Sequence, residues 1–307
     1  MKYSIKHLDF TEHQMFLENL YSYSFFQTPA WIESLINSYP GYYNQSLLFE
    51  FTDGVQIFLP LIGIRKLAGI MHTSHSMPFN TYGGLLSVHN GIKSYMDTVV
   101  SFIMKGNCWK FVLTPSPFEF SDVPYHALEV PLETHFLDLD SEYLKVWEKC
   151  YDSKNRNQIR KARKSGLEIL INPPDSGKRY FELYKSSLEI RKTKTTLTYP
   201  KELFLQLQRF PESVKYYFAV SGLKTYAGIM VFWGKNTAIY WGAAITEEGK
   251  PLCANQYLLD YAIQESISNN ILKFDLGASK GILSLSKFKE SFGAKKLMYR
   301  SYVVKKL

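Results

Sequence analysis

Alternating apolar and polar residues predict a β-hairpin in each half of the chain. The segment 47–63, LLFEFTDGVQIFLPLIG, alternates around Asp53-Gly54, and the segment 216–234, YYFAVSGLKTYAGIMVFWG, alternates around Ser221-Gly222. Period-two alternation around a glycine turn is typical of two antiparallel strands. An aromatic-glycine segment follows each hairpin, and we interpret it as a third strand at 82–84 and 240–242.

A helical pattern comes next in both halves. Apolar residues recur with a 3.6-residue period over 92–103 and over 258–267, which predicts two amphipathic helices. Each helix leads into a strand, NCWKFVLTPS at 107–116 and NILKFDLGAS at 270–279, and the two strands match in register so that Lys110 and Lys273 are equivalent. This series of elements, occurring twice in the same order, predicts a tandem repeat.

The segment between the repeats predicts the domain boundary. LDSEYLKVWEKCYDSKNRNQIRKARKSG is helical in pattern from Ser141 to Lys164, with Ser141 as N-cap and Gly166 as a stop signal. A chain of 307 residues is close to the length at which a single core divides into two. We therefore expect two domains, 1–138 and 139–307.

Composition and charge narrow the class of protein. The apolar fraction of 46% and aromatic fraction of 16% indicate a globular chain, and the formal charge of +8 favours an anionic partner such as a phosphorylated cofactor, nucleic acid or a membrane surface. The N-terminus does not resemble a signal peptide, and no apolar stretch approaches the ~18 residues of a membrane span. We expect a cytoplasmic protein, with peripheral contact at the inner membrane face left open.

Cysteine and histidine spacing predicts neither a disulfide framework nor a metal site. The three cysteines, Cys108, Cys150 and Cys253, are odd in number and widely separated, so we expect reduced thiols. His72 and His75 lie three apart, but no third ligand follows at metal spacing.

The order of elements in the second half is that of a GNAT core, and its details resemble the Fem-type (FemAB-like) family. That family includes enzymes that add bridge amino acids to peptidoglycan precursors and relatives that acylate polysaccharide or lipid precursors. The resemblance rests on five stretches: TPAWIESL near Thr28, Leu59-Pro60-Leu61, KNRNQIRKARKSGL, Glu189-Ile190-Arg191 and FDLGASKGILSLSKFKESFG. The last is the most specific, with Asp275, Gly277, Lys289, Phe292 and Gly293 in the family's pattern.

The resemblance implies an α/β (α+β) fold of tandem GNAT-like domains, each with a mixed, mostly antiparallel sheet flanked by helices. It places catalysis in the second domain. This sequence lacks two features found in related enzymes. The turn TEEGKPLCANQ lacks the glycine-rich pyrophosphate loop of ordinary acetyl-CoA enzymes, and no charged heptad segment forms a coiled-coil arm. The donor therefore stays open between acyl-CoA, an acyl carrier protein thioester and aminoacyl-tRNA.

Basic residues and a helix start are the candidate donor-binding groups. Arg156, Arg160 and Arg163 share one helical face, where like charges repel unless an anion binds between them; a solvated face is the alternative. The turn from Gly249 to Asn255 opens a helix whose first amide groups suit a phosphate or carboxylate. The resemblance adds Arg191, at the end of the helix expected after Pro173-Pro174.

Four residues are candidates for acid, base or leaving-group chemistry. Asp275 lies in an apolar strand where the first repeat has Val112, so it is either a base or orienting group, or a carboxylate that binds backbone amides at the strand end. By pattern Lys289 belongs to a surface helix, whereas the resemblance implies contact with the donor or its leaving group. Glu189 and Tyr240 are the remaining acid-base candidates.

These features predict an acyltransferase that needs no covalent intermediate, since the sequence has no GxSxG elbow and no recognisable Cys-His nucleophile pair. The leading hypothesis is transfer of an acyl group from a thioester to an amine or hydroxyl of a sugar or lipid-linked envelope precursor. The first alternative is aminoacyl transfer from tRNA to such a precursor. The second alternative is a non-catalytic module that binds nucleic acid or an anionic polymer.

Overall fold

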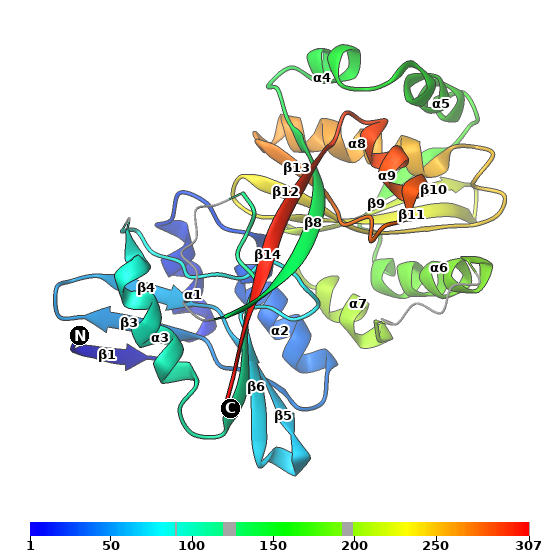
Figure 1. Cartoon of the computed structure of the whole chain (residues 1–307). Coiled ribbons are helices and arrows are strands. Elements are labelled where there is room, and N and C mark those ends of the chain that lie inside the picture. Colours follow the sequence, from blue (N-terminus) through cyan, green and yellow to red (C-terminus); the bar gives the residue numbers. More distant parts are fainter. Residues whose placement is uncertain (90, 119–126, 192–198, 307) are drawn as a thin grey trace. The chain divides into compact units, whose positions relative to one another are not determined.

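The computed structural model describes residues 1–89, 91–118, 127–191 and 199–306 (Figure 1). The chain forms two compact units, residues 1–132 with 298–307, and residues 133–297. It passes from the first unit to the second within β8 (Leu128–Asp138) and returns within β14 (Lys295–Lys305). The division thus differs from the expected 1–138 and 139–307, because the C-terminal residues pair with β7 (Cys108–Leu113) of the first unit.

The first unit contains a small sheet of three strands in the order β1 (Tyr3–Lys6), β3 (Leu47–Phe51) and β4 (Gln56–Leu59). β3 and β4 form the hairpin predicted around Asp53-Gly54, and Gly54 adopts a φ of +88° there. The helices α1 (Phe10–Glu18) and α2 (Pro29–Ser38) lie in the chain between β1 and β3.

The main sheet of the first unit has the order β2-β5-β6-β7-β14. Its strands β2 (Tyr42–Asn44), β5 (Ile62–Lys66) and β6 (Met71–His75) are antiparallel neighbours, while β6 and β7 run parallel. A parallel pair needs a crossover, which α3 (Met96–Ile103) supplies. The apolar face of α3 packs with β7 in the unit's core through Met96, Val99, Ile103, Phe111 and Leu113.

The sheet of the second unit has the order β8-β13-β12-β11-β10-β9. The strands after β8 are β9 (Glu168–Ile171), β10 (Val214–Ser221), β11 (Lys224–Trp233), β12 (Thr237–Ile245) and β13 (Lys273–Gly277). β12 and β13 are the parallel pair, and α8 (Ala254–Ser268) connects them.

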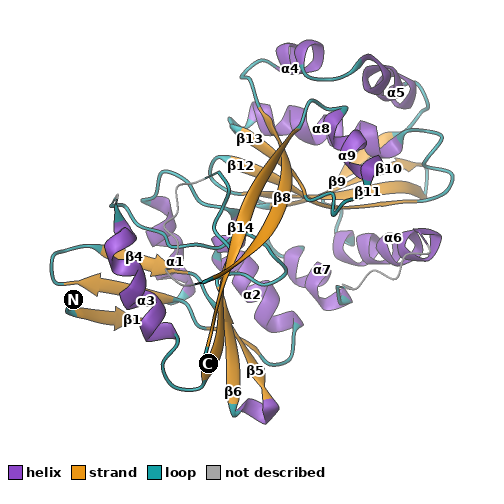
Figure 2. Ribbon diagram, in the orientation of Figure 1, coloured by secondary structure: helices purple, strands orange, loops and turns teal. Residues whose placement is uncertain are grey.

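Helices cover both faces of this second sheet (Figure 2). In β10 the odd residues Tyr217 and Ala219 belong to the same core cluster as α8. The even residues face the other side, where the Tyr216 ring meets Tyr180 of α6 (Ser176–Arg191) at 5.8 Å and the Tyr216 hydroxyl donates to Phe204 O in α7 (Lys201–Leu207). A strand buried on both faces explains why this segment is so rich in apolar and aromatic residues.

The two units repeat the same topology, which confirms the predicted fold class of tandem GNAT-like domains. The strands β2, β5, β6, β7 and β14 follow the order and directions of β10, β11, β12, β13 and β8. Lys110 pairs with Thr73 and Lys273 pairs with Thr237 in the two parallel pairs, so the predicted equivalence of these lysines holds.

Two details of the predicted repeat are wrong. The hairpin 47–63 is not the counterpart of β10 and β11, because it belongs to the separate small sheet inserted between β2 and β5. The third strand is β6 rather than 82–84, which is not a strand. β2 has three residues, too few to show alternation, and the clear alternating pattern belongs to the longer inserted hairpin instead.

The helix predicted from Ser141 to Lys164 is two helices, α4 (Tyr143–Lys149) and α5 (Ser153–Arg163). The chain breaks between them because the Asp152 carboxylate accepts the Asn155 N–H as an N-cap, at 2.6 Å. Ser141 is not the N-cap of α4, since that residue is Glu142. Gly166 follows α5 with a φ of +74°, as its role as a stop signal requires.

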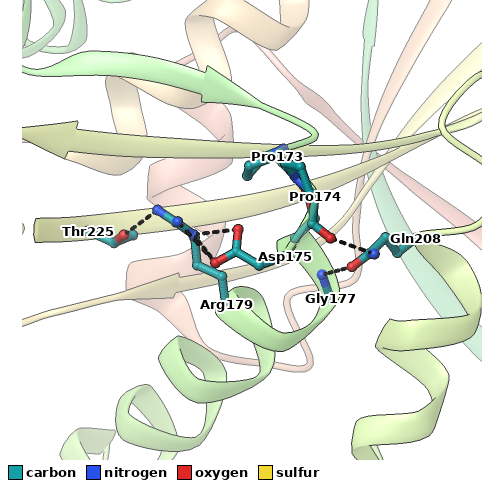
Figure 3. Close-up of polar contacts among 8 residues, drawn as sticks. Pro173, Pro174, Asp175, Gly177, Arg179, Gln208 and Thr225 are labelled. Atoms are coloured by element: carbon teal, nitrogen blue, oxygen red, sulfur yellow. Dashed lines mark hydrogen bonds and ion pairs between the residues drawn. The ribbon is translucent and has the colours of Figure 1, made fainter. Parts of the chain in front are cut away.

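The start of α6 is fastened to the end of α7 by one side chain (Figure 3). Gln208 accepts from the Gly177 N–H at 2.7 Å and donates to Pro174 O at 2.8 Å. A Cβ on Gly177 would lie 2.5 Å from Phe204 O, so only glycine permits this approach. Asp175 and Arg179 form an ion pair of 3.0 Å on the same turn. These contacts fix one end of α6 against α7.

Candidate active site

The parallel strands β12 and β13 separate at Asp275. They pair over three positions, ending at Ile239 and Asp275, although β12 continues to Ile245. Trp241 is an extra residue in the register of β12 against β11, which makes a β-bulge. Bulges bend a strand and redirect its side chains. At Gly277, its last residue, β13 pairs once more with β8, after a shift in register that sets Gly277 opposite His135.

Asp275 lies buried at this point, with 1% of its surface exposed. Its Oδ1 accepts the hydroxyl hydrogen of Thr134 from β8 and the backbone N–H of Gly277 at 2.8 Å. The sequence left two roles open for Asp275, a base or orienting group and a carboxylate that binds backbone amides at the strand end. The contact with Gly277 is of the second kind.

Lys289 is also buried, with 2% of its surface exposed, although its helix α9 (Leu283–Glu290) lies in a charged segment. Its ammonium group donates to Gly277 O and Ala278 O, each at 2.7 Å. Burial lowers the pKa of Lys289 to about 8, against the opposing attraction of Asp275 and Glu133. The prediction of a surface side chain from pattern alone is therefore wrong.

Asp275 and Lys289 meet at one residue, Gly277, and bind the two peptide units on either side of its Cα. Asp275 binds the N–H of Gly277, and Lys289 binds its carbonyl. Gly277 has a φ of +72°, a conformation that favours glycine, so the Asp-Leu-Gly pattern has a backbone reason. The structure thus brings together the two residues that the family pattern singled out.

A second group of polar side chains adjoins this turn, and the sequence reasoning missed it. His135 of β8 is fully buried, and its two ring nitrogens lie 3.0 Å from Ser286 Oγ and 3.4 Å from Ser279 Oγ. Glu133 accepts the Ser279 N–H and forms an ion pair of 2.5 Å with Lys296. Burial, followed by the positive charge of Lys289, lowers the pKa of His135. The signal in the sequence was the Glu-Thr-His run in the middle of β8.

The other two catalytic candidates, Tyr240 and Glu189, come from β12 and α6. Tyr240 is buried in β12 directly after the last pair with β13, and its carbonyl is 3.8 Å from where a Cβ on Gly277 would stand. Glu189 is exposed on α6, and within the described chain no hydrogen bond or ion pair joins it to Asp275 or Lys289.

The start of α8 offers backbone donors. Its N-cap, Cys253, has a φ of +56° and makes no side-chain cap. In the described part of the chain nothing accepts from the N–H groups of Asn255 and Gln256, and Asn255 Oδ1 is buried without a partner. Gly249 is used internally, since its N–H donates to Thr246 and a Cβ on it would lie 2.4 Å from Tyr226 O. An anionic group with acceptor oxygens fits this helix start.

The basic face of α5 makes contacts within the protein. Arg156 donates to the carbonyls of Trp147 and Tyr151 at the end of α4, which gives it the role of a helix C-cap. Arg163 forms an ion pair of 2.7 Å with buried Asp260 of α8. Arg160 and Arg163 both lie over the Trp147 ring, at 5.4 and 5.3 Å. Arg191 is the last residue of α6, and its side chain lies outside the described set.

No three His, Cys, Asp or Glu side chains among the described residues are grouped as a metal site would need. His72 and His75 contact Gln45 and Thr73, respectively. Of the helices within the described ranges, none has both the length and the apolar character to cross a bilayer.

Most of the second unit matches a known family model. Residues 153–289 match the family model described as an acetyltransferase (GNAT) domain. That range includes the separating strands, α8 and both Asp275 and Lys289. None of the curated proteins matches the sequence.

Solved structures share the fold along almost the whole chain. FemX superposes with a TM-score of 0.72 at 10% identity, over 98% of this chain and 97% of that one. L-PGS from Bacillus licheniformis gives 0.54 at 15% identity, over 97% and 92%. A tandem GNAT protein from the clavulanic acid biosynthesis pathway gives 0.53 at 11% identity, over 99% and 98%. These likenesses confirm, at the level of fold, the resemblance to tandem GNAT proteins of the Fem type.

Proposed function

We propose that the chain transfers an acyl group from a thioester, acyl-CoA or an acyl carrier protein, to an amine or hydroxyl of a sugar or lipid-linked envelope precursor. The observation that carries the proposal is the turn at Gly277, where a buried carboxylate binds the backbone N–H and a buried ammonium group binds the backbone carbonyl of this one residue. A buried lysine is costly to fold around, and perturbed groups of this kind cluster at functional sites.

The donor's anionic portion fits the start of α8. The backbone N–H groups of Asn255 and Gln256 are the groups that would hold it. When bound, the donor supplies an activated carbonyl carbon. The turn before α8 is not glycine-rich, and its Gly249 packs against the backbone of Tyr226. A pyrophosphate therefore cannot approach this backbone as closely as it would a glycine-rich loop.

Lys289 is the candidate for leaving-group stabilisation. As the nucleophile's new bond to the acyl carbon forms, the carbon–sulfur bond breaks and negative charge develops on sulfur. A positive charge nearby stabilises that thiolate, and the nucleophile's proton passes to a base or to the thiolate itself. Asp275 positions the turn that Lys289 binds, and Tyr240, beside the same turn, is the proposed proton carrier.

Aminoacyl transfer from tRNA is the second candidate. It is favoured by the likeness to FemX, whose TM-score of 0.72 exceeds the 0.53 of the tandem GNAT protein. The Fem-type resemblance implies such a donor, and the absent pyrophosphate loop agrees with it. The acceptor keeps its role, and Lys289 would stabilise negative charge on the departing ribose oxygen in place of sulfur, as the carbon–oxygen ester bond breaks.

Native mass spectrometry of the full chain with acetyl-CoA, longer acyl-CoAs, an acyl carrier protein thioester and charged tRNA tests the proposal. Saturable binding of a thioester, followed by transfer to an amine or hydroxyl acceptor, supports the leading function. Binding and transfer from charged tRNA alone supports the second. Binding of RNA or an anionic polymer with no turnover of any donor contradicts both and identifies a binding module.

A further inference from the structure

The β5–β6 hairpin of the first unit ends in an exposed apolar tip. Leu67 and Ile70 expose 69% and 70% of their surface. They occupy the four-residue connection between β5 and β6, and Figure 1 shows this hairpin extending from the sheet of the first unit. Turns are ordinarily built from glycine, asparagine or aspartate, which makes two large apolar side chains at this position unusual.

The backbone of the tip makes the choice of leucine more unusual. Leu67 has a φ of +47°, in the left-handed region that a residue with a side chain enters at a cost. Its side chain is exposed, so the cost is not offset by packing into the unit's core. A glycine or asparagine would relieve the backbone, and folding alone gives no reason to keep leucine.

Cations surround this tip without carboxylate partners. Arg65 and Lys66 lead into it along β5, and both are exposed. Lys306 donates from its side chain to Gly106 O, next to Lys105, and the neighbouring Asn107 O accepts the His72 N–H of β6. Within the described residues none of these four cations forms an ion pair with a carboxylate. The same end of the unit therefore carries a positive charge that the protein leaves uncompensated.

A second exposed hairpin leucine shows the contrast. Leu223, at the turn between β10 and β11, is fully exposed, but the adjacent Lys224 is paired with Glu248 at 2.9 Å. Its charge is locally balanced, and one apolar residue stands there instead of two. An exposed leucine alone needs no explanation. The combination at Leu67 and Ile70 does.

We infer that the tip of the β5–β6 hairpin docks onto an anionic lipid bilayer. Leu67 and Ile70 enter the boundary between headgroups and acyl chains, and Arg65, Lys66, Lys105 and Lys306 face the anionic headgroups. Apolar side chains flanked by cations are the combination that binds such surfaces, since each alone gives weak attachment. The inference concerns the first unit and does not depend on the proposed function of the second.

Vesicle co-sedimentation of the full chain tests this inference. The wild-type chain is expected to bind vesicles of equal parts phosphatidylglycerol and phosphatidylcholine, and not vesicles of phosphatidylcholine alone. Replacing Leu67→Ser and Ile70→Ser together should weaken binding by more than about tenfold. The pair Arg65→Gln and Lys66→Gln should weaken it by roughly twentyfold, since each cation near an anionic surface contributes about fivefold.

The matched control is Leu223→Ser, which removes an equally exposed hairpin leucine and should leave vesicle binding unchanged. Circular dichroism checks that the variants are folded. Wild-type chain that stays in solution with the mixed vesicles overturns the inference, as does a Leu67→Ser, Ile70→Ser variant that binds as well as wild type. Binding of RNA that requires Arg65 and Lys66, without binding of vesicles, also overturns the inference. Turnover with a soluble acceptor is a separate measurement that reports on the second unit.

Discussion

At the end of β7, in the first unit, neutral groups satisfy the strand's last backbone atoms. Thr114 O accepts from the Gly83 N–H at 2.7 Å, and the Thr114 N–H donates to Ser76 Oγ at 2.9 Å. At the end of β13, in the second unit, the corresponding carbonyl belongs to Gly277, and it accepts from the Lys289 ammonium group. Asp275 stands where the first unit has Val112.

The neighbouring strands differ in the same way. In the first unit the Ser301 hydroxyl of β14 bonds to the Thr114 hydroxyl at 2.9 Å, whereas in the second the Thr134 hydroxyl of β8 donates to the Asp275 carboxylate. The first unit shows that this strand end can be closed with neutral groups. Burying ions costs more than burying hydroxyls, so the charged strand end is the costlier solution, which is why we propose that the second unit keeps these groups for chemistry.

The largest expected effect is the pH dependence of stability caused by Lys289. Its pKa is about 8 in the folded chain and 10.5 ordinarily, so between these values the unfolded chain binds one more proton. The penalty for burying the charge is complete below pH 8 and is relieved as the pH rises toward 10.5. The free energy of unfolding of wild type relative to Lys289→Met should therefore rise by up to about 3 kcal/mol over this range.

Urea unfolding of the two proteins at intervals from pH 7 to 10.5 measures this difference. Lys287→Met, an exposed lysine on the same helix, is the matched control and should follow wild type. A difference between wild type and Lys289→Met that stays flat with pH would contradict the assignment of a buried charge at Gly277.

Turnover is the next effect. Lys289→Met should lower the rate of transfer about a hundredfold, the size expected for loss of one group that stabilises developing negative charge. Lys287→Met should retain wild-type turnover. Activity should also fall as the pH rises through about 8, where Lys289 loses its proton. Full activity of Lys289→Met with the donor found by mass spectrometry would exclude the lysine from the reaction.

Gly83→Ala tests the neutral side of the comparison. A Cβ at this position would lie 2.5 Å from the backbone of Ser76, so the segment that binds the end of β7 must shift. We expect a loss of about 1 to 3 kcal/mol in the first unit's stability, with donor binding in the second unit retained. Calorimetry and donor titration measure the two quantities, and unchanged stability would show that Gly83 does not close the strand end.

Gln208→Ala separates stability from chemistry within the second unit and has the smallest effect. It removes the two hydrogen bonds that fasten α6 to α7, so stability should fall by about 1 kcal/mol. Gln206→Ala, two residues earlier in α7, is the control. Its stability should fall by less than about half as much as that of Gln208→Ala. Transfer rates should be equal in all three proteins, and a large loss of turnover in Gln208→Ala would extend the site to α6.

Much of the fold could be predicted because its long elements carry strong patterns. The alternation in 216–234 predicts β10 and β11, and the helical period in 258–267 predicts α8. The similarity of segments 107–116 and 270–279 correctly predicts that Lys110 and Lys273 are equivalent. The first unit's repeat was harder to align, since β2 has three residues and an inserted hairpin carries the clearer alternation. The pairing of the C-terminal strand with β7 depends on contacts distant in sequence, which no local pattern encodes.

The candidate site was predictable in part for a similar reason. Asp275 is conspicuous in an apolar strand, and the family pattern named Lys289. Burial of Lys289 is not visible in its own helix, because the carbonyls that bind it come from Gly277 and Ala278. His135 was missed because its partners, Ser279 and Ser286, lie about 150 residues away and only the folded sheet brings them together.

Hydrogen–deuterium exchange of the full chain, with and without the donor that it turns over, tests the central claim most directly. The claim is that the charged strand end of the second unit, and not its neutral counterpart in the first, is where the donor reacts. Donor-dependent protection should appear in peptides covering 240–257 and 275–289 and be absent from 72–86 and 111–116. Protection confined to the first unit's segments, with 275–289 unchanged, would contradict the account.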